Sequence, residues 1–359
     1  MAVAAVVIAG ASIYYLRPNL GPRPVTVAKT VIRHPVQRPN DIVLYTFRGA
    51  QLGWAAVGQP LNDESGTVSI YRTVDGARSW EAELTVPTAL LFATFDSFQF
   101  VDSSRGALIA GNPPALLSTL DGGLHWSAKT LPSPDTRYVR FLDSWSALAW
   151  SAPAVPNARG QLYWTADSGD SWTNGPSLPP HANPVPVFRN HLEGWVGVDD
   201  PSRARVYSTA DGGATWTEHY VPSSAGSTRV STVPRLLPGS GVLVQVFSPS
   251  SSANWYRTFD GGTSWIPVVE PIPSSDFPNY VFVDSTHWWE VVSAELYKTA
   301  DAGQTWTDFA RAPVGLGVIQ VTDSRHAWAG LDEGYGTELL YTSDGGAHWR
   351  AVNVPDPMA

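Results

Sequence analysis

Short apolar runs alternate with turn residues along most of this chain. Val, Tyr, Trp and Thr gather in runs of about five residues, and Gly, Asp, Ser and Pro interrupt them about every ten residues. Residues 138–175 are an example, with the runs YVRFL, SALAW, QLYWT and SWTNG. No long segment has the 3.6-residue apolar period of an amphipathic helix. The pattern predicts an all-β protein made of many short strands.

One nine-residue string, RTFDGGTSW at 257–265, is one of seven similar copies that follow one another at intervals of 41 to 49 residues. Its aspartate and its tryptophan never vary. The pairs are Asp75 and Trp80, Asp121 and Trp126, Asp167 and Trp172, Asp211 and Trp216, Asp260 and Trp265, Asp301 and Trp306, and Asp344 and Trp349. A looser strand–turn–strand motif, such as FLDSWSALAW at 141–150, precedes each string. Each unit therefore contains four strand-like runs.

Seven units of four strands predict a closed seven-bladed β-propeller over residues 41–359. All seven units are complete in register, so the sequence gives no sign of strand exchange between the last and first blades. Residues 24–32, PVTVAKTVI, are a candidate for one additional edge strand.

The recurring string has the chemistry of a hairpin turn. Its carboxylate can accept backbone N–H groups just after it, and glycine supplies positive φ. Its tryptophan is expected to fill the space between neighbouring blades, with the indole N–H meeting an acceptor. Seven equivalent copies around a ring cannot converge on one substrate, and one carboxylate per turn is too few for calcium. These residues are therefore interpreted as structural, and neither a metal nor a cofactor is expected.

The string [ST]-x-D-G-G-x-[TS]-W is similar to the Asp-box, the bacterial neuraminidase repeat. Seven boxes, each after an F-x-D strand pair, resemble the photosystem II stability/assembly factor family of seven-bladed propellers over residues 41–354. That resemblance implies a non-catalytic protein that binds a membrane-protein precursor. Nothing in the sequence itself points to pigment or to a photosystem.

The amino-terminal part differs from the repeats. Residues 2–16 are uncharged and strongly apolar, so 1–16 is expected to form a hydrophobic helix that acts as an anchor or signal segment. Residues 17–40 contain five prolines and scattered arginines, which is typical of an extended juxtamembrane linker. An extracytoplasmic, membrane-anchored propeller is favoured. The basic residues after the apolar segment leave a cytoplasmic orientation open, and a buried first strand is another alternative.

Composition removes several functional classes. The chain has no cysteine, which excludes disulfides, thiol catalysis, Cys-ligated metals and a lipidated N-terminal cysteine. The net charge is −9, and all but three of its 23 basic residues are arginine. No basic cluster with interleaved aromatic residues occurs, so nucleic acid is not an expected partner.

Strand order divides the loops between two faces of the disc. The boxes and the turns between first and second strands share one face, here the box face. The loops between second and third strands and between blades share the other, here the unrepeated face, where function is expected. Candidate binding residues on it are Arg137, Arg159, Arg203, Arg205 and Arg229 in blades three to five, and the acidic pairs Asp63–Glu64, Asp199–Asp200 and Asp332–Glu333.

Two functions fit this arrangement. The arginines would suit anionic groups or an acidic partner segment, as in a scaffold that binds a protein or peptide. The acidic pairs of the neighbouring blades one and seven would instead suit a sialidase-like or xyloglucanase-like glycoside hydrolase, or a glycan-binding protein. Because no convergent catalytic set is evident, non-catalytic protein binding is the preferred interpretation.

Overall fold

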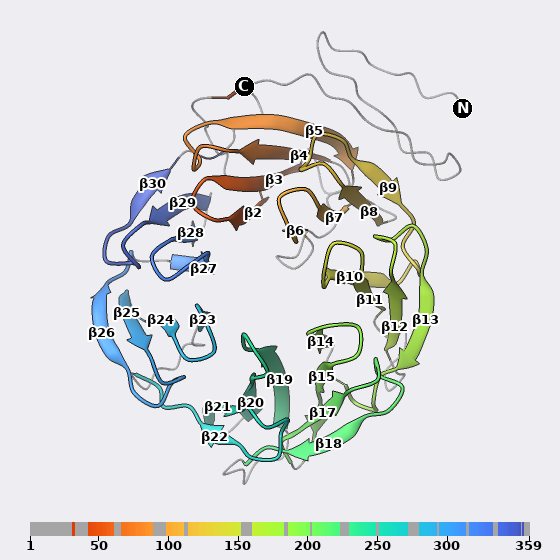
Figure 1. Cartoon of the computed structure of the whole chain (residues 1–359), viewed down its shortest axis with the longest axis vertical. Coiled ribbons are helices and arrows are strands. Elements are labelled where there is room, and N and C mark those ends of the chain that lie inside the picture. The colour runs from red at the N-terminus through yellow and green to blue at the C-terminus, as the bar shows by residue number, and fades with distance from the viewer. Residues whose placement is uncertain are drawn as a thin grey trace.

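The computed structural model describes residues 31–32, 42–60, 66–88, 98–110, 114–151, 160–182, 186–201, 203–222, 230–248, 251–271, 280–292, 294–313, 316–332, 337–352 and 354. These residues form seven antiparallel sheets arranged in a ring, so the predicted seven-bladed all-β propeller is confirmed (Figure 1). The expected helix at 1–16 and most of the linker at 17–40 lie outside this part of the chain. Among the described residues, no helix has the length and apolar character needed to cross a bilayer.

Four strands in chain order make up each blade, from the centre of the ring to its rim. Blade 1 consists of β2 (Ile42–Arg48), β3 (Leu52–Pro60), β4 (Gly66–Thr73) and β5 (Trp80–Thr88). Blade 2 consists of β6 (Phe98–Phe100), β7 (Gly106–Ala110), β8 (Ala115–Thr119) and β9 (Ser127–Lys129). Blade 3 consists of β10 (Thr136–Phe141), β11 (Ala147–Ser151), β12 (Gln161–Thr165) and β13 (Thr173–Ser177). Blade 4 consists of β14 (Val187–Phe188), β15 (Gly194–Gly197), β17 (Arg205–Thr209) and β18 (Thr217–Tyr220). Blade 5 consists of β19 (Val230–Leu236), β20 (Val242–Ser248), β21 (Ser251–Thr258) and β22 (Ile266–Pro267). Blade 6 consists of β23 (Val281–Phe282), β24 (Trp288–Val292), β25 (Glu295–Thr299) and β26 (Thr307–Arg311). Blade 7 consists of β27 (Leu316–Val321), β28 (Ala327–Asp332), β29 (Thr337–Thr342) and β30 (Arg350–Val352).

Two short strands are added to this plan. Strand β1 (Val31–Ile32) pairs with the outer strand of blade 1, with Ile32 opposite Trp80. An edge strand was expected within 24–32, and residues 31–32 form it. Strand β16 (Asp199–Asp200) leaves blade 4 and pairs with the inner strand of blade 5.

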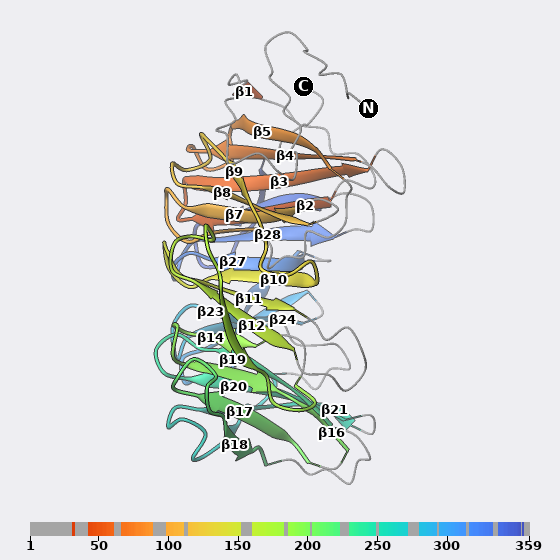
Figure 2. The ribbon, with the colours of Figure 1, turned by 90° about the vertical axis from the view of Figure 1, so that its right-hand side faces the viewer.

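Seen edge-on in Figure 2, the ring is a disc.

Each box is organised by its aspartate together with a threonine two residues before it. In blade 3, the Thr165 hydroxyl donates to Oδ1 of Asp167 over 2.6 Å and accepts the amide of Gly169 over 2.9 Å. The Asp167 carboxylate also accepts the amide and the hydroxyl of Ser171, over 2.9 and 2.6 Å. The threonine contacts recur in all seven boxes, and so does the bond from the fourth amide after the aspartate.

The glycines after each aspartate occupy the left-handed region of φ, as expected. Where another residue replaces them, the conformation is kept: Ala77, Ser168 and Ala302 have φ of 60°, 61° and 57°. In six of the seven boxes, all but that of blade 5, the amide of the first position after the aspartate donates to the preceding turn of its own blade, as from Gly122 to the carbonyl of Ser104 over 2.6 Å. The boxes and these turns therefore share one face.

The box tryptophans pack in the joints between blades, but the expectation about their indole nitrogens is only partly correct. Trp126 donates to the carbonyl of Gly123 over 2.9 Å, and Trp306 donates to the carbonyl of Val269 over 2.5 Å. The buried indole nitrogens of Trp172, Trp216, Trp265 and Trp349 have no hydrogen-bond partner in the part of the chain that the structure describes. Those four rings pack against apolar clusters that join two blades, where burying a large ring outweighs an unmade hydrogen bond.

Candidate functional site

The structure describes only part of the residues proposed for the unrepeated face. Arg159, Arg229, Asp63, Glu64 and Glu333 lie outside the described residues. Arg137 lies in β10 and Asp332 ends β28, but their side chains are not described. The remaining candidates are Arg203, Arg205 and the pair Asp199–Asp200. All four belong to the segment that follows the second strand of blade 4.

A close approach of two backbones positions this segment. A Cβ at Gly197 would lie 1.8 Å from the carbonyl oxygen of Thr232 in blade 5, so only glycine fits there. The amide of Val198 donates to the Thr232 hydroxyl over 2.9 Å, and that hydroxyl donates to the carbonyl of Arg205 over 2.6 Å. With these contacts in place, the chain leaves β15 in blade 4, and the next strand, β16, pairs with the inner edge of β19 in blade 5 (Figure 1).

Asp199–Asp200 was interpreted as an exposed pair in a loop, and the structure corrects this. The two residues form β16, and only 6% of Asp200 is exposed. Because Asp200 is buried in the joint between two blades, it needs partners. The amide of Arg203 donates to its Oδ1 over 2.8 Å, and the Arg205 guanidinium pairs with its Oδ2.

Arg205 is consequently not available to an external anion. Its guanidinium lies between two carboxylates, pairing with Asp200 and, over 2.5 Å, with Oε1 of Glu218. Burial alone would lower the pKa of Arg205, but the hydrogen bond to Glu218 and the nearby charges raise it. Tyr207 completes this network by donating to the same Glu218 oxygen over 3.1 Å. The expectation that Arg205 contributes to a basic binding patch is not supported by this geometry.

Arg203 and Tyr220 form the exposed edge of the same cluster. Arg203 is exposed, and its guanidinium carbon lies 5.8 Å from the centre of the Tyr220 ring. The Tyr220 ring is 54% exposed, while its hydroxyl donates to Oε2 of Glu218 over 3.1 Å. Within the described part of the chain, no ion pair occupies the Arg203 guanidinium. A cation beside an accessible aromatic ring is suited to a peptide that presents a carboxylate.

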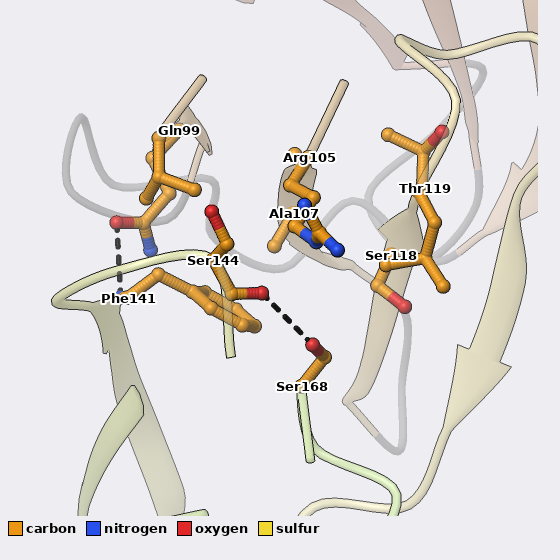
Figure 3. Close-up of a pocket in the computed structure, with 11 residues that line it drawn as sticks. Gln99, Arg105, Ala107, Ser118, Thr119, Phe141, Ser144 and Ser168 are labelled. Carbon is orange, nitrogen blue, oxygen red and sulfur yellow. Dashed lines mark hydrogen bonds between the residues drawn. The ribbon is translucent and has the colours of Figure 1, made fainter. Parts of the chain in front are cut away.

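A hollow between blades 2 and 3 on the box face has a different character. Gln99, Arg105, Ser118, Ser144 and Ser168 contribute to its lining (Figure 3). It has room for about one water molecule. Its polar groups are largely used within the joint: the amide of Phe141 donates to Gln99 over 3.1 Å, and the Ser168 hydroxyl donates to the carbonyl of Ser144 over 3.0 Å. This hollow is a polar joint between blades.

The hydrolase alternative finds no support in the described residues. The carboxyl groups of blades 1 and 7 that it requires lie outside the described side chains. In the ranges that the structure describes, no group of three or more His, Asp or Glu is arranged to hold a metal ion. The aromatic residues Trp255 and Tyr280 are buried between blades 5 and 6 and offer no exposed surface to a sugar.

Comparisons with known proteins separate the two functions. The family model described as "Photosynthesis system II assembly factor YCF48" matches residues 88–358. The chain is 28% identical over 271 residues to the photosystem II assembly lipoprotein Ycf48 of Synechococcus sp. (strain CC9902), covering 72% of this chain and 74% of that protein. It is 24% identical to the chloroplastic photosystem II stability/assembly factor HCF136 of Arabidopsis thaliana, covering 72% and 67%.

Solved structures establish the fold alone. A YCF48 structure with a bound D1 peptide has a TM-score of 0.51 and 18% identity, and the match covers 91% of this chain and 97% of that one. A xyloglucanase from Xanthomonas campestris has a TM-score of 0.54 and 14% identity, covering 87% and 60%. Because an assembly factor and a hydrolase fit equally well, shape does not decide function. The family match does: it confirms the non-catalytic, assembly-factor-like interpretation, and this chain belongs to the photosystem II assembly factor YCF48 family.

Proposed function

We propose that this protein is a membrane-associated, extracytoplasmic assembly factor whose unrepeated face binds a peptide segment of a membrane-protein precursor. Family membership supports the assembly role. A relative that was solved with a D1 peptide supports a peptide from a membrane protein as the ligand. The box residues take no part in this binding and stabilise the ring.

The observation that carries the proposal is the pairing of Arg203 with Tyr220. The network of Asp200, Arg205 and Glu218 holds the backbone and the ring in place, so the exposed cation and ring are ordered before a ligand arrives. Ordering of this kind reduces the entropy lost on binding. In this proposal Arg137, Arg159 and Arg229 extend the basic surface, and Arg205 positions Arg203 without touching the peptide.

Membrane attachment is proposed to come from residues 2–16, followed by the linker at 17–40. The Synechococcus relatives are named lipoproteins. Residues 1–359 contain no cysteine that would carry a lipid, so the apolar segment is the feature of this sequence that would replace it. Carbonate extraction of membranes tests this, because deletion of 2–16 should move the protein into the soluble fraction.

Binding of a fluorescently labelled D1 peptide, followed by anisotropy, tests the site. Arg203→Glu should weaken binding about tenfold or more, since it reverses a charge at the contact. The matched control is Arg325→Glu, which makes the same charge change on the box face, where Arg325 is exposed. Equal affinities of wild type and Arg203→Glu, with both proteins folded, would remove this surface from the proposal.

A further inference from the structure

One buried position breaks the chemical regularity of the seven blades. The position lies in the second strand of each blade, two places after the residue that pairs with the last apolar residue of the inner strand. Six blades have a small or branched apolar residue there: Ala55, Leu108, Ala149, Val196, Val244 and Ala329. Blade 6 has Glu290. All seven residues are buried, and Glu290 is only 1% exposed.

The surroundings of Glu290 are aromatic. It lies on the same face of β24 as Trp288, which packs in the joint between blades 5 and 6 with Trp255 and Tyr280. The centres of the Trp255 and Tyr280 rings are 5.0 Å apart, and those of Tyr280 and Trp288 are 6.1 Å apart. A carboxylate in such a place has lost its water and needs a compensating charge.

Within the described residues, Glu290 has no compensating partner. Oε2 of Glu290 and the hydroxyl of Tyr280 are both buried, and neither has a hydrogen-bond partner among the residues that the structure describes. The charged group acting on Glu290 is a second carboxylate, Glu270, from the segment after β22. Burial first, and then the charge of Glu270, raise the pKa of Glu290 to about 8. Burial, and then the charge of Glu290, raise the pKa of Tyr280.

The other titratable groups on the facing surfaces do not alter this balance. Tyr297 of β25 lies opposite Glu290, and its own pKa is raised by burial and by surrounding carboxylates. From blade 5, the buried Arg257 donates to the carbonyl of Ala302. Arg235 lies with its guanidinium carbon 5.3 Å from the centre of the Trp255 ring. Neither arginine is among the charges acting on Glu290.

We infer that Glu290 makes the joint between blades 5 and 6 depend on protonation: the neutral carboxyl lets the joint close, and ionisation opens it to water. The folded state binds this proton more tightly than the unfolded or opened state. Its stabilising effect is therefore complete below the ordinary glutamate pKa of about 4.3, and is lost as pH rises through about 8. The other six joints, with apolar residues at this position, lack this dependence.

Infrared spectroscopy and hydrogen exchange test the inference on the full chain. Wild type at pH 6.5 should show the C=O band of a buried protonated carboxyl, absent from Glu290→Gln. Amide protection in β21 and β24, corrected for intrinsic exchange, should fall about tenfold or more between pH 6.5 and pH 9. Glu290→Gln keeps the shape of the side chain without its charge and should abolish this fall.

Glu338→Gln is the control, because Glu338 is exposed in blade 7 and its loss should leave the pH response unchanged. The inference is overturned if protection of β21 and β24 does not change with pH, or if Glu290→Gln responds as wild type does. If Glu290→Gln fails to fold, the wild-type spectrum decides. A carboxyl band that disappears near pH 8 together with the protection supports the inference, and absence of that band at pH 6.5 refutes it.

Discussion

Phe47 of blade 1 stacks on Trp328 of blade 7, with ring centres 3.7 Å apart and planes 4° from parallel. Trp54 of blade 1 and Phe100 of blade 2 make the same contact, at 3.7 Å and 6°. The indole of Trp328 donates to the carbonyl of Gly49, and that of Trp54 donates to the carbonyl of Gly122. The joint that closes the ring is therefore built like a joint between consecutive blades, without exchange of a strand between blades 7 and 1 among the described residues.

Phe47→Ala is expected to destabilise the protein by about 3–5 kcal/mol, because it empties a fully packed site at the closing joint. Chemical denaturation measures this. Phe259→Ala, which removes a ring that is 41% exposed on the box face, serves as the control and should cost less than about 1 kcal/mol. Equal effects of the two substitutions would contradict a closure that depends on this stack.

Gly197→Ala is expected to disrupt the joint between blades 4 and 5, since the new Cβ would collide with the backbone of Thr232. We expect a loss of several kcal/mol, or no folded protein. Gly239→Ala is the control that has the backbone strain without the collision: Gly239 has a φ of 77°, and no atom of the described residues lies within 4 Å of the new Cβ. That control should cost about 1 kcal/mol. Similar thermal midpoints for both variants would show that the close approach is unimportant.

The box residues show what the sequence could and could not predict. Asp260 and Trp265 were found by repetition, and repetition sufficed for the number of blades and their strand order. Thr258 begins the recurring pattern, and threonine fills its position in all seven boxes, but the sequence gives it no role. In the structure its hydroxyl connects the carboxylate of Asp260 to the amide of Gly262. The pairing of Asp200 with Arg205 was beyond prediction, because β16 crosses between blades and no repeat marks it.

Stability should depend on pH with opposite signs at two ends of the range. Hydrogen bonds, chiefly from the Ser171 and Thr215 hydroxyls, lower the pKa of Asp167 and of Asp211 to about 2. Because these values lie below the unfolded value of about 3.9, the stabilisation is present above pH 4 and is lost as pH falls through about 2. Glu290 acts in the other direction, reducing stability as pH rises towards about 8. Thermal midpoints measured from pH 2 to pH 9 should thus peak on the acidic side of neutrality.

Asp167→Ala should lower the free energy of unfolding near pH 6 by about 1–2 kcal/mol, because the substitution removes the hydrogen bonds of an exposed carboxylate and not a buried charge. It should also weaken the loss of stability below pH 4. Asp135→Ala is the matched control, since Asp135 is an exposed aspartate outside any box. An unchanged acid response in Asp167→Ala would argue against a stabilising role of the box carboxylates.

Arg205→Ala tests whether Arg205 only holds the blade 4 cluster in place while Arg203 contacts the peptide. Removing the guanidinium leaves the buried Asp200 without its cation, so we expect the free energy of unfolding to fall by about 1–3 kcal/mol. This is less than for a fully buried pair, because a quarter of the Arg205 side chain is exposed. Arg203→Ala should change stability by less than about 0.5 kcal/mol and still weaken peptide binding. The Arg205→Ala loss should shrink in an Asp200→Asn background, where no buried charge remains to be paired. An Arg205→Ala protein of full stability that no longer binds peptide would make Arg205 a direct contact and reverse the roles assigned to the two arginines.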